Sequence, residues 1–171
     1  MAKATLTISS KNYSSWSLRG WLMCRMAGID FEEEVMPADD PSTRAELLLL
    51  SPSFLVPALT YDGVKVLPMN LKAHYPGFKI WAGAQADIDR VTAIWRECLE
   101  TYGGPYLFGP TLTMADAMYA PVCTRFATYG VALDPACAAY SARILAWPAM
   151  QEWIAAAKQE PDDIEELEVE F

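Results

Sequence analysis

A polar segment near the N-terminus carries the side chains best suited to chemistry. Residues 12–15 read Asn-Tyr-Ser-Ser, and an apolar pattern typical of a helix begins directly after them at Trp16. A hydroxyl group at the N-terminus of a helix lies among converging N–H groups and at the positive end of the helix dipole. Such a position favours a bound anion, for example a thiolate. The segment therefore predicts either a thiolate-binding loop or a simple N-cap pair of serines for the helix.

A Val56-Pro57 step at the start of a predicted strand is the second unusual feature. Proline has no N–H group to donate to a sheet, so Pro57 must lie at a sheet edge, at a strand start or in a cis turn. The backbone of Val56 can then pair with something other than a neighbouring strand. A peptide-like ligand is one such partner.

The first 66 residues alternate between strand and helix patterns, which is typical of an α/β unit. They predict a strand-helix-strand unit with parallel strands, followed by an antiparallel hairpin that turns at Asp62-Gly63. The predicted elements are a strand over 4–9, a helix over 16–27, a strand over 30–36, a short helix over 44–50, and strands over 56–61 and 64–66.

Only helical patterns follow residue 67. They predict helices over 85–102, 114–128, 136–145 and 148–158. An α/β part followed by an all-α part indicates two domains, 1–66 and 67–171. Thr113 and Asp116 form an Asp variant of the capping box, so we assign both to folding rather than to catalysis.

Composition excludes several classes of function. The chain of 171 residues has a formal net charge of −9, and it offers no basic field for nucleic acid. No apolar run approaches membrane-spanning length, and no residue cluster predicts a metal site. Four scattered cysteines without a signal peptide indicate reduced thiols and a cytoplasmic protein. Residues 160–170 are strongly acidic, and we interpret them as a solvated tail.

Three stretches, in this order and spacing, resemble the cytosolic glutathione transferase family, most closely its bacterial serine-type members related to the zeta class. Residues 12–19 resemble the active loop that leads into the first helix. Residues 55–59 resemble the family's cis-proline strand start, and residues 104–117 its turn and capped helix in the helical domain. The resemblance implies an α/β thioredoxin-like N-terminal domain, an all-α C-terminal domain and glutathione as co-substrate.

By this resemblance, a side chain of the loop donates a hydrogen bond to the glutathione sulfur. An ungapped alignment puts Asn12 and Tyr13 where the zeta class has paired serines, and Ser14 where that class has a cysteine. The candidates for the catalytic side chain are therefore Ser14, then Asn12, then Ser15. Tyr13 is a further possibility, because other classes use a tyrosine from a nearby position.

The resemblance also implies residues that bind the rest of glutathione. Val56 is expected to pair its backbone with the cysteinyl part, in a geometry that Pro57 sets. Arg19 either reaches a carboxylate of the ligand or serves as a structural ion-pair partner. Phe54 stands where the family commonly has a glycine, a departure that narrows the pocket or leaves the side chain packed outward.

The largest departure from the family follows Val66, which is joined directly to Leu67. At this point the family has a Glu/Asp-Ser pair that holds the γ-glutamyl group, followed by two helices. Such a segment amounts to roughly forty to sixty residues. We therefore expect a chain that apparently lacks a central segment after Val66, either through a true deletion or because the recorded sequence omits that segment.

Three functions remain open at this stage. The first is a glutathione transferase that acts on a small electrophile in detoxification, as a homodimer of the kind the family usually forms. The second is a zeta-like glutathione-dependent isomerase, and the third is a non-catalytic binding protein, which the missing γ-glutamyl anchor favours. Several aromatic side chains either line the electrophile site or belong to the core; they are Trp81, Trp95, Tyr102 and Tyr106.

Overall fold

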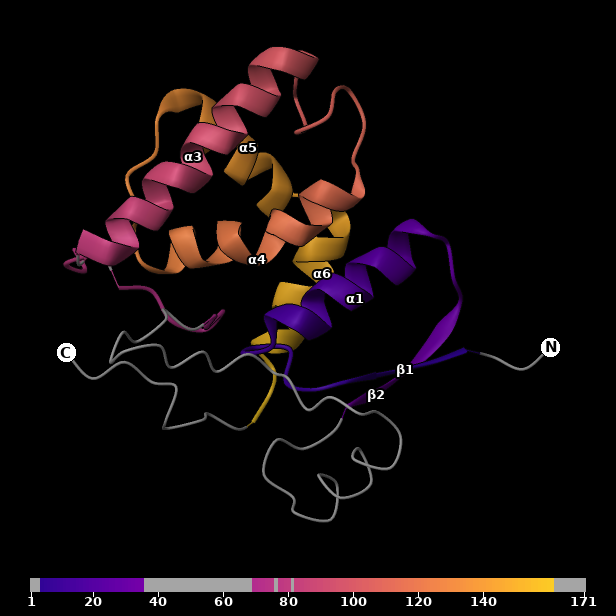
Figure 1. Ribbon diagram of the computed structural model, residues 1–171. Helices are drawn as coiled ribbons and strands as arrows, with labels where there is room; N and C mark the ends of the chain where they lie inside the picture. Colours follow the sequence, from indigo (N-terminus) through magenta and orange to yellow (C-terminus); the bar gives the residue numbers. More distant parts are fainter. Residues whose placement is uncertain (1–3, 36–68, 76, 81, 162–171) are drawn as a thin grey trace.

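Two parallel strands and the helix between them form residues 4–35 (Figure 1). Strand β1 (Ala4–Ile8) pairs in parallel with β2 (Phe31–Val35), and helix α1 (Ser15–Met26) connects the two strands. The predicted strand-helix-strand unit is thereby confirmed. The structure, a computed structural model, describes residues 4–35, 69–75, 77–80 and 82–161.

The other predicted elements of the thioredoxin-like domain lie outside the described residues. They are the helix over 44–50 and the strands over 56–61 and 64–66. Val56, Pro57 and the junction between Val66 and Leu67 lie outside them as well. A complete thioredoxin-like sheet therefore stays a prediction.

Four helices lie within residues 82–161, and their bounds agree with the predicted bounds to within three residues. They are α3 (Ala82–Tyr102), α4 (Met114–Thr128), α5 (Pro135–Leu145) and α6 (Pro148–Ala157). Both α5 and α6 begin with a proline, a residue whose missing N–H group costs nothing in the first turn of a helix. None of the described helices is both long and apolar enough to cross a membrane.

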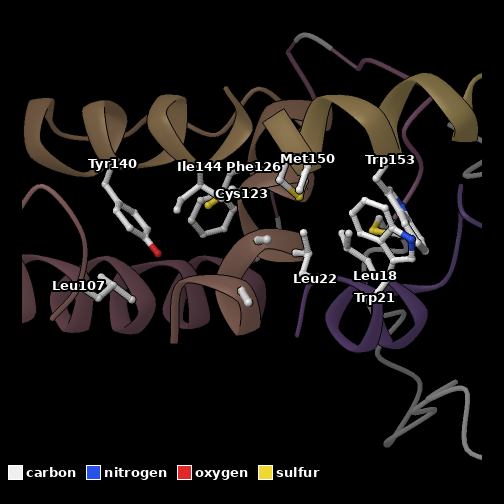
Figure 2. Packing of buried hydrophobic residues seen from close by; sticks show 14 of the residues in the cluster. Leu18, Trp21, Leu22, Leu107, Cys123, Phe126, Tyr140, Ile144, Met150 and Trp153 are labelled. Carbon is white, nitrogen blue, oxygen red and sulfur yellow. The ribbon is translucent and has the colours of Figure 1, made fainter. Parts of the chain in front are cut away.

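Helix α4 packs against α1 and α5, so the N-terminal unit and the helical part share one core (Figure 2). Leu18 and Leu22 of α1 are fully buried. Trp21 of α1 packs against Trp153 of α6, with ring centroids 5.4 Å apart. Trp95 of α3 is fully buried as well, which places this aromatic side chain in the core rather than at a ligand surface.

The chain from residue 69 to residue 75 runs along the C-terminal end of α4. Thr128 donates its hydroxyl hydrogen to the Asn70 carbonyl oxygen at 2.9 Å. The Tyr75 N–H group donates to the Thr128 carbonyl oxygen at 2.7 Å. Further hydrogen bonds, from Ser15 to Met69 and from Leu71 to Asn12, place the same segment beside the N-terminal end of α1, where the polar loop lies.

Candidate functional site

Ser14 is the N-cap of α1. Its Oγ atom accepts a hydrogen bond from the Ser17 N–H group at 3.1 Å, and its hydroxyl donates to Ser17 Oγ at 2.8 Å. Such a bond satisfies one of the N–H groups that the first turn of a helix leaves without a partner. The N-cap interpretation is therefore confirmed for Ser14, and the cap uses both the oxygen and the hydrogen of its hydroxyl.

Asn12 joins the polar loop to the segment that follows residue 68. Its Oδ1 atom accepts hydrogen bonds from the N–H groups of Leu71, at 2.6 Å, and Lys72, at 3.2 Å. The side chain is completely buried, and its Nδ2 group has no acceptor among the described residues. A buried donor without an acceptor is costly, so this group fits a ligand that brings an acceptor atom.

Ser15 is the first residue of α1, and its hydroxyl lies between a cation and a sulfur atom. Its Oγ atom accepts a hydrogen bond from Arg125 Nη2 at 2.7 Å. The hydroxyl donates in turn to the thioether sulfur of Met69 at 3.7 Å. A serine at the N-terminus of a helix thus already makes a hydrogen bond to sulfur.

Two arginines make the surroundings of Ser15 positive. Arg125 projects from α4, and burial, with repulsion from Arg19, lowers the pKa of its guanidinium to about 10. Arg125 is therefore charged at neutral pH. Arg19 donates its Nε hydrogen to the Met118 carbonyl oxygen at 2.9 Å, and its guanidinium lies 4.9 Å from the centre of the Trp16 ring. Positive charge near a helix N-terminus adds to the dipole in favouring an anion.

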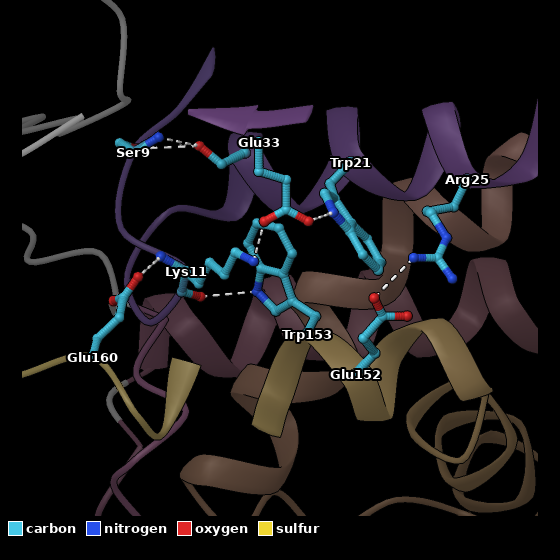
Figure 3. A network of polar contacts seen from close by, with 9 residues as sticks. Ser9, Lys11, Trp21, Arg25, Glu33, Glu152, Trp153 and Glu160 are labelled. Carbon is cyan, nitrogen blue, oxygen red and sulfur yellow. Dashed lines mark hydrogen bonds and ion pairs between the residues drawn. The ribbon is translucent and has the colours of Figure 1, made fainter. Parts of the chain in front are cut away.

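Glu160, which follows α6, contacts the polar loop at residues 10–12 (Figure 3). Its carboxylate accepts hydrogen bonds from the Ser10 hydroxyl and from the N–H groups of Lys11 and Asn12. Trp153 supports the same loop by donating its Nε1 hydrogen to the Lys11 carbonyl oxygen at 2.8 Å. The prediction of a solvated acidic tail is therefore wrong at its first residue, because Glu160 is partly buried against these donors.

The structure brings the three predicted catalytic residues together on one turn and all three are buried. They are Asn12, Ser14 and Ser15. Arg19 lies one turn farther along α1, and the predicted partners Val56 and Pro57 lie outside the described residues. Within the described part of the chain, no group of acidic, histidine or cysteine side chains is arranged to hold a metal ion.

Sequence reasoning missed two residues that contact this loop, Arg125 and Glu160. Arg125 lies within a helical pattern, where its apolar neighbours indicated only a core helix. Glu160 belongs to a run of acidic residues that resembles any exposed tail. Neither residue stands in a local motif, and the sequence alone held no signal for their contacts with a loop more than one hundred residues away.

Comparison with protein families identifies the two parts of the chain. Residues 13–68 match the family model described as glutathione S-transferase, N-terminal domain. Residues 73–156 match the family model described as glutathione S-transferase, C-terminal domain. A comparison with curated proteins finds no match.

The two matches follow each other along the chain and together cover most of it, so the chain belongs to the glutathione S-transferase family. The family resemblance predicted from the three sequence stretches is confirmed. Its narrower form, a bacterial serine-type member related to the zeta class, stays a prediction.

Proposed function

We propose that this protein is a glutathione transferase that stabilises the glutathione thiolate for attack on a small electrophile. Membership of the family supports glutathione as the co-substrate. The observation that carries the proposal is the Ser15 hydroxyl, which is held by Arg125 and donates to the sulfur of Met69. A thiolate is a stronger hydrogen-bond acceptor than a thioether, so the same hydroxyl can serve the sulfur of glutathione.

Among the three candidates, the contacts favour Ser15 over Ser14 and Asn12. The cap of α1 uses the Ser14 hydroxyl, and two main-chain N–H groups use the Asn12 carbonyl oxygen. Ser15 accepts from a guanidinium, and a hydroxyl that accepts from a cation becomes a better donor. The preferred residue thus changes from Ser14 to Ser15, while the Asn12 Nδ2 group offers a second donor to the ligand.

The proposed reaction needs no oxidation or reduction. The glutathione thiol releases its proton to solvent, and Ser15 and the helix N-terminus stabilise the resulting thiolate. The sulfur then donates an electron pair to an electrophilic carbon and forms a C–S bond, while the displaced group leaves with the pair from the broken bond. Residues 12–15 contain no cysteine, so the nucleophilic sulfur comes from glutathione itself.

The rest of the glutathione site follows the family resemblance. We propose that the backbone of Val56, beside Pro57, pairs with the cysteinyl part, and that Arg19 contributes positive charge to the site. The match to the N-terminal domain of the family supports this assignment, because it includes all three residues. A zeta-like isomerase would use the same thiolate in a reversible addition, and only its electrophile would differ.

Retention on immobilised glutathione, followed by turnover of a chromogenic aryl halide, tests the function with the full chain. The protein should be retained, should be eluted by free glutathione, and should conjugate the halide. S-methylglutathione should compete for binding without supporting turnover, because its sulfur cannot become a thiolate. Absence of both retention and turnover would remove the proposed function.

A non-catalytic binding or interaction protein of the same family is the second candidate, and the burial of the loop favours it. The exposed fractions of Asn12, Ser14 and Ser15 are 0%, 3% and 6%. Residues this well covered admit a ligand only if their neighbours move. Absence of thiol-dependent turnover with several electrophiles, together with a stable protein complex in a pull-down, would select this candidate.

The domain boundary, the homodimer and the cytoplasmic location belong to the same proposal. We place the domain boundary between residues 66 and 67, which the matched ranges 13–68 and 73–156 support. A homodimer in the cytoplasm agrees with the family and with four cysteines that form no disulfide. Light scattering coupled to size-exclusion chromatography would test the homodimer.

A further inference from the structure

Three segments that are far apart in the sequence meet in one closed set of hydrogen bonds. They are the loop over residues 10–14, the chain at Lys72, and Glu160, which lies just beyond the end of α6. Lys72 Nζ donates to the main-chain carbonyl oxygen of Glu160 at 2.7 Å. The main-chain N–H group of Lys72 donates to Asn12 Oδ1 at 3.2 Å. The Asn12 N–H group donates to the Glu160 carboxylate at 3.1 Å and completes the circuit.

Within this circuit, the carboxylate of Glu160 sets the direction of one hydroxyl. Ser10 donates its hydroxyl hydrogen to Glu160 Oε2 at 2.6 Å. Its oxygen is then left to accept, and it does so from the N–H groups of Asn12, at 3.1 Å, and Tyr13, at 3.2 Å. The oriented hydroxyl therefore holds the turn that leads into α1.

The same turn ends at the N-cap of α1. The Ser14 N–H group donates to the Ser10 carbonyl oxygen at 3.0 Å. The Lys11 N–H group donates directly to Glu160, and Figure 3 shows the carboxylate facing this part of the loop. Hydrogen bonds to an ionised acceptor are roughly twice as strong as bonds between neutral groups. A single carboxylate thus holds the backbone that places Ser15 at the start of the helix.

We propose that Glu160 is a positioning residue for the thiol-binding loop. This inference rests on the proposed glutathione function. Glu160 acts through Ser10 and the loop backbone rather than on reacting atoms, and it fixes the position of the Ser15 hydroxyl before the ligand binds. Such pre-organisation matters because a displacement of about 1 Å can lower a rate by about a hundredfold.

The test compares Glu160→Gln and Glu160→Asp with the wild-type full chain. Glutamine keeps the size of the side chain but replaces one acceptor oxygen by an NH₂ donor, which then faces the N–H and O–H donors of the loop. Aspartate keeps the charge on a shorter stem. Glu152→Gln is the matched control, because Glu152 lies in α6 and pairs with Arg25 at an exposed position away from the loop.

Two readouts separate positioning from a general loss of stability. The first is amide hydrogen exchange at residues 11–14, with α4 as the internal reference. The second is kcat/KM together with the pH profile of turnover, corrected for the folded fraction that circular dichroism reports. Glu160→Gln should speed exchange in the loop alone, lower kcat/KM by roughly tenfold to a hundredfold and shift the profile to higher pH. Glu160→Asp should recover part of each effect, and Glu152→Gln should match the wild type.

Unchanged loop exchange in Glu160→Gln would overturn the proposal. An activity loss that only follows the folded fraction would also overturn it. A wild type that neither binds glutathione nor turns over would instead remove the proposed function, and with it the catalytic consequence of Glu160. The exchange comparison decides in that case too whether Glu160 orders the loop.

Discussion

Ser15 Oγ lies 2.7 Å from Arg125 Nη2, although 110 positions separate the two residues in the sequence. The bond joins the first residue of α1 to a residue of α4, and thus the proposed thiol-binding loop to the helical part of the protein. Because the oxygen of Ser15 accepts from a cation, its own hydrogen is directed to the sulfur of Met69. This relationship leads to two predictions about the acidity of a bound thiol.

Ser15→Ala should raise the pKa of the thiol of bound glutathione. Losing one hydrogen bond to a charged acceptor costs about 1.5–3 kcal/mol, which corresponds to roughly one to two pKa units. The thiolate fraction, followed by its ultraviolet absorbance, should therefore rise at higher pH than in the wild type. Ser14→Ala is the matched variant, and it should mainly lower the free energy of unfolding, by about 1 kcal/mol, because it removes the N-cap. A larger pKa change in Ser14→Ala than in Ser15→Ala would restore Ser14 as the catalytic hydroxyl.

Arg125→Met should also raise the pKa of the bound thiol, because a positive charge near the sulfur favours the thiolate. Arg125→Lys keeps the charge but loses the fixed geometry of the guanidinium, so its effect should be smaller. The measurement is the pH at which turnover reaches half of its plateau. Arg143→Met is the control, since Arg143 is exposed on α5 and donates to the Pro105 carbonyl oxygen instead. Equal profiles for Arg125→Met and the wild type would contradict the electrostatic role.

The capping box of α4 should contribute far more to stability than the partly exposed cap of α5, which Asp134 forms. Asp116 is fully buried, and it accepts from the Thr113 N–H and hydroxyl groups, from the Leu107 N–H group and from the Tyr140 hydroxyl. Asp116→Ala should cost about 3 kcal/mol or more, because it leaves buried donors without an acceptor. Asp134→Ala should cost about 1 kcal/mol. Urea unfolding of the two variants measures the difference, and equal costs would show that burial of the cap adds nothing.

Local pattern was sufficient to predict the helices among the residues that the structure describes. The expected bounds 114–128 coincide with α4, because Thr113 gives a start signal and the apolar run ends before Gly130. Helix α3 begins at residue 82 rather than at the expected residue 85, because Ala82, Gly83 and Ala84 add no periodic apolar side chain. Burial of Trp95 followed from its helical spacing in the same way.

The contacts around the proposed site were beyond the reach of sequence reasoning. An N-cap role was one of the two interpretations of Ser14 because that signal is local, whereas the partner of Ser15 depends on how α1 packs against α4. Glu160 was interpreted as part of a solvated tail, since a run of acidic residues does not reveal the N–H groups that one of its members meets after folding. Tertiary packing decides such pairs, and a single sequence does not encode them in any local spacing.

Glu33 should make the stability of the protein depend on pH. Burial alone would raise the pKa of this carboxyl group, but hydrogen bonds from Lys11 and Trp21, with attraction to Lys11 and Arg25, lower it overall. A folded-state pKa below the unfolded value gives stability that is present above the unfolded pKa, about 4.3, and is lost as the pH falls through the folded pKa. Glu33→Gln removes this contribution at neutral pH.

The free energy of unfolding, measured in urea from neutral to acidic pH, tests this expectation. The wild type should be more stable than Glu33→Gln at neutral pH, and the two curves should converge below the folded-state pKa of Glu33, where the wild-type carboxyl group is protonated as well. Glu100→Gln, an exposed variant in α3, should follow the wild-type curve throughout. Parallel curves for the wild type and Glu33→Gln would mean that Glu33 stabilises the fold through its shape rather than its charge. The contact between β2 and Lys11 would then not anchor the loop electrostatically.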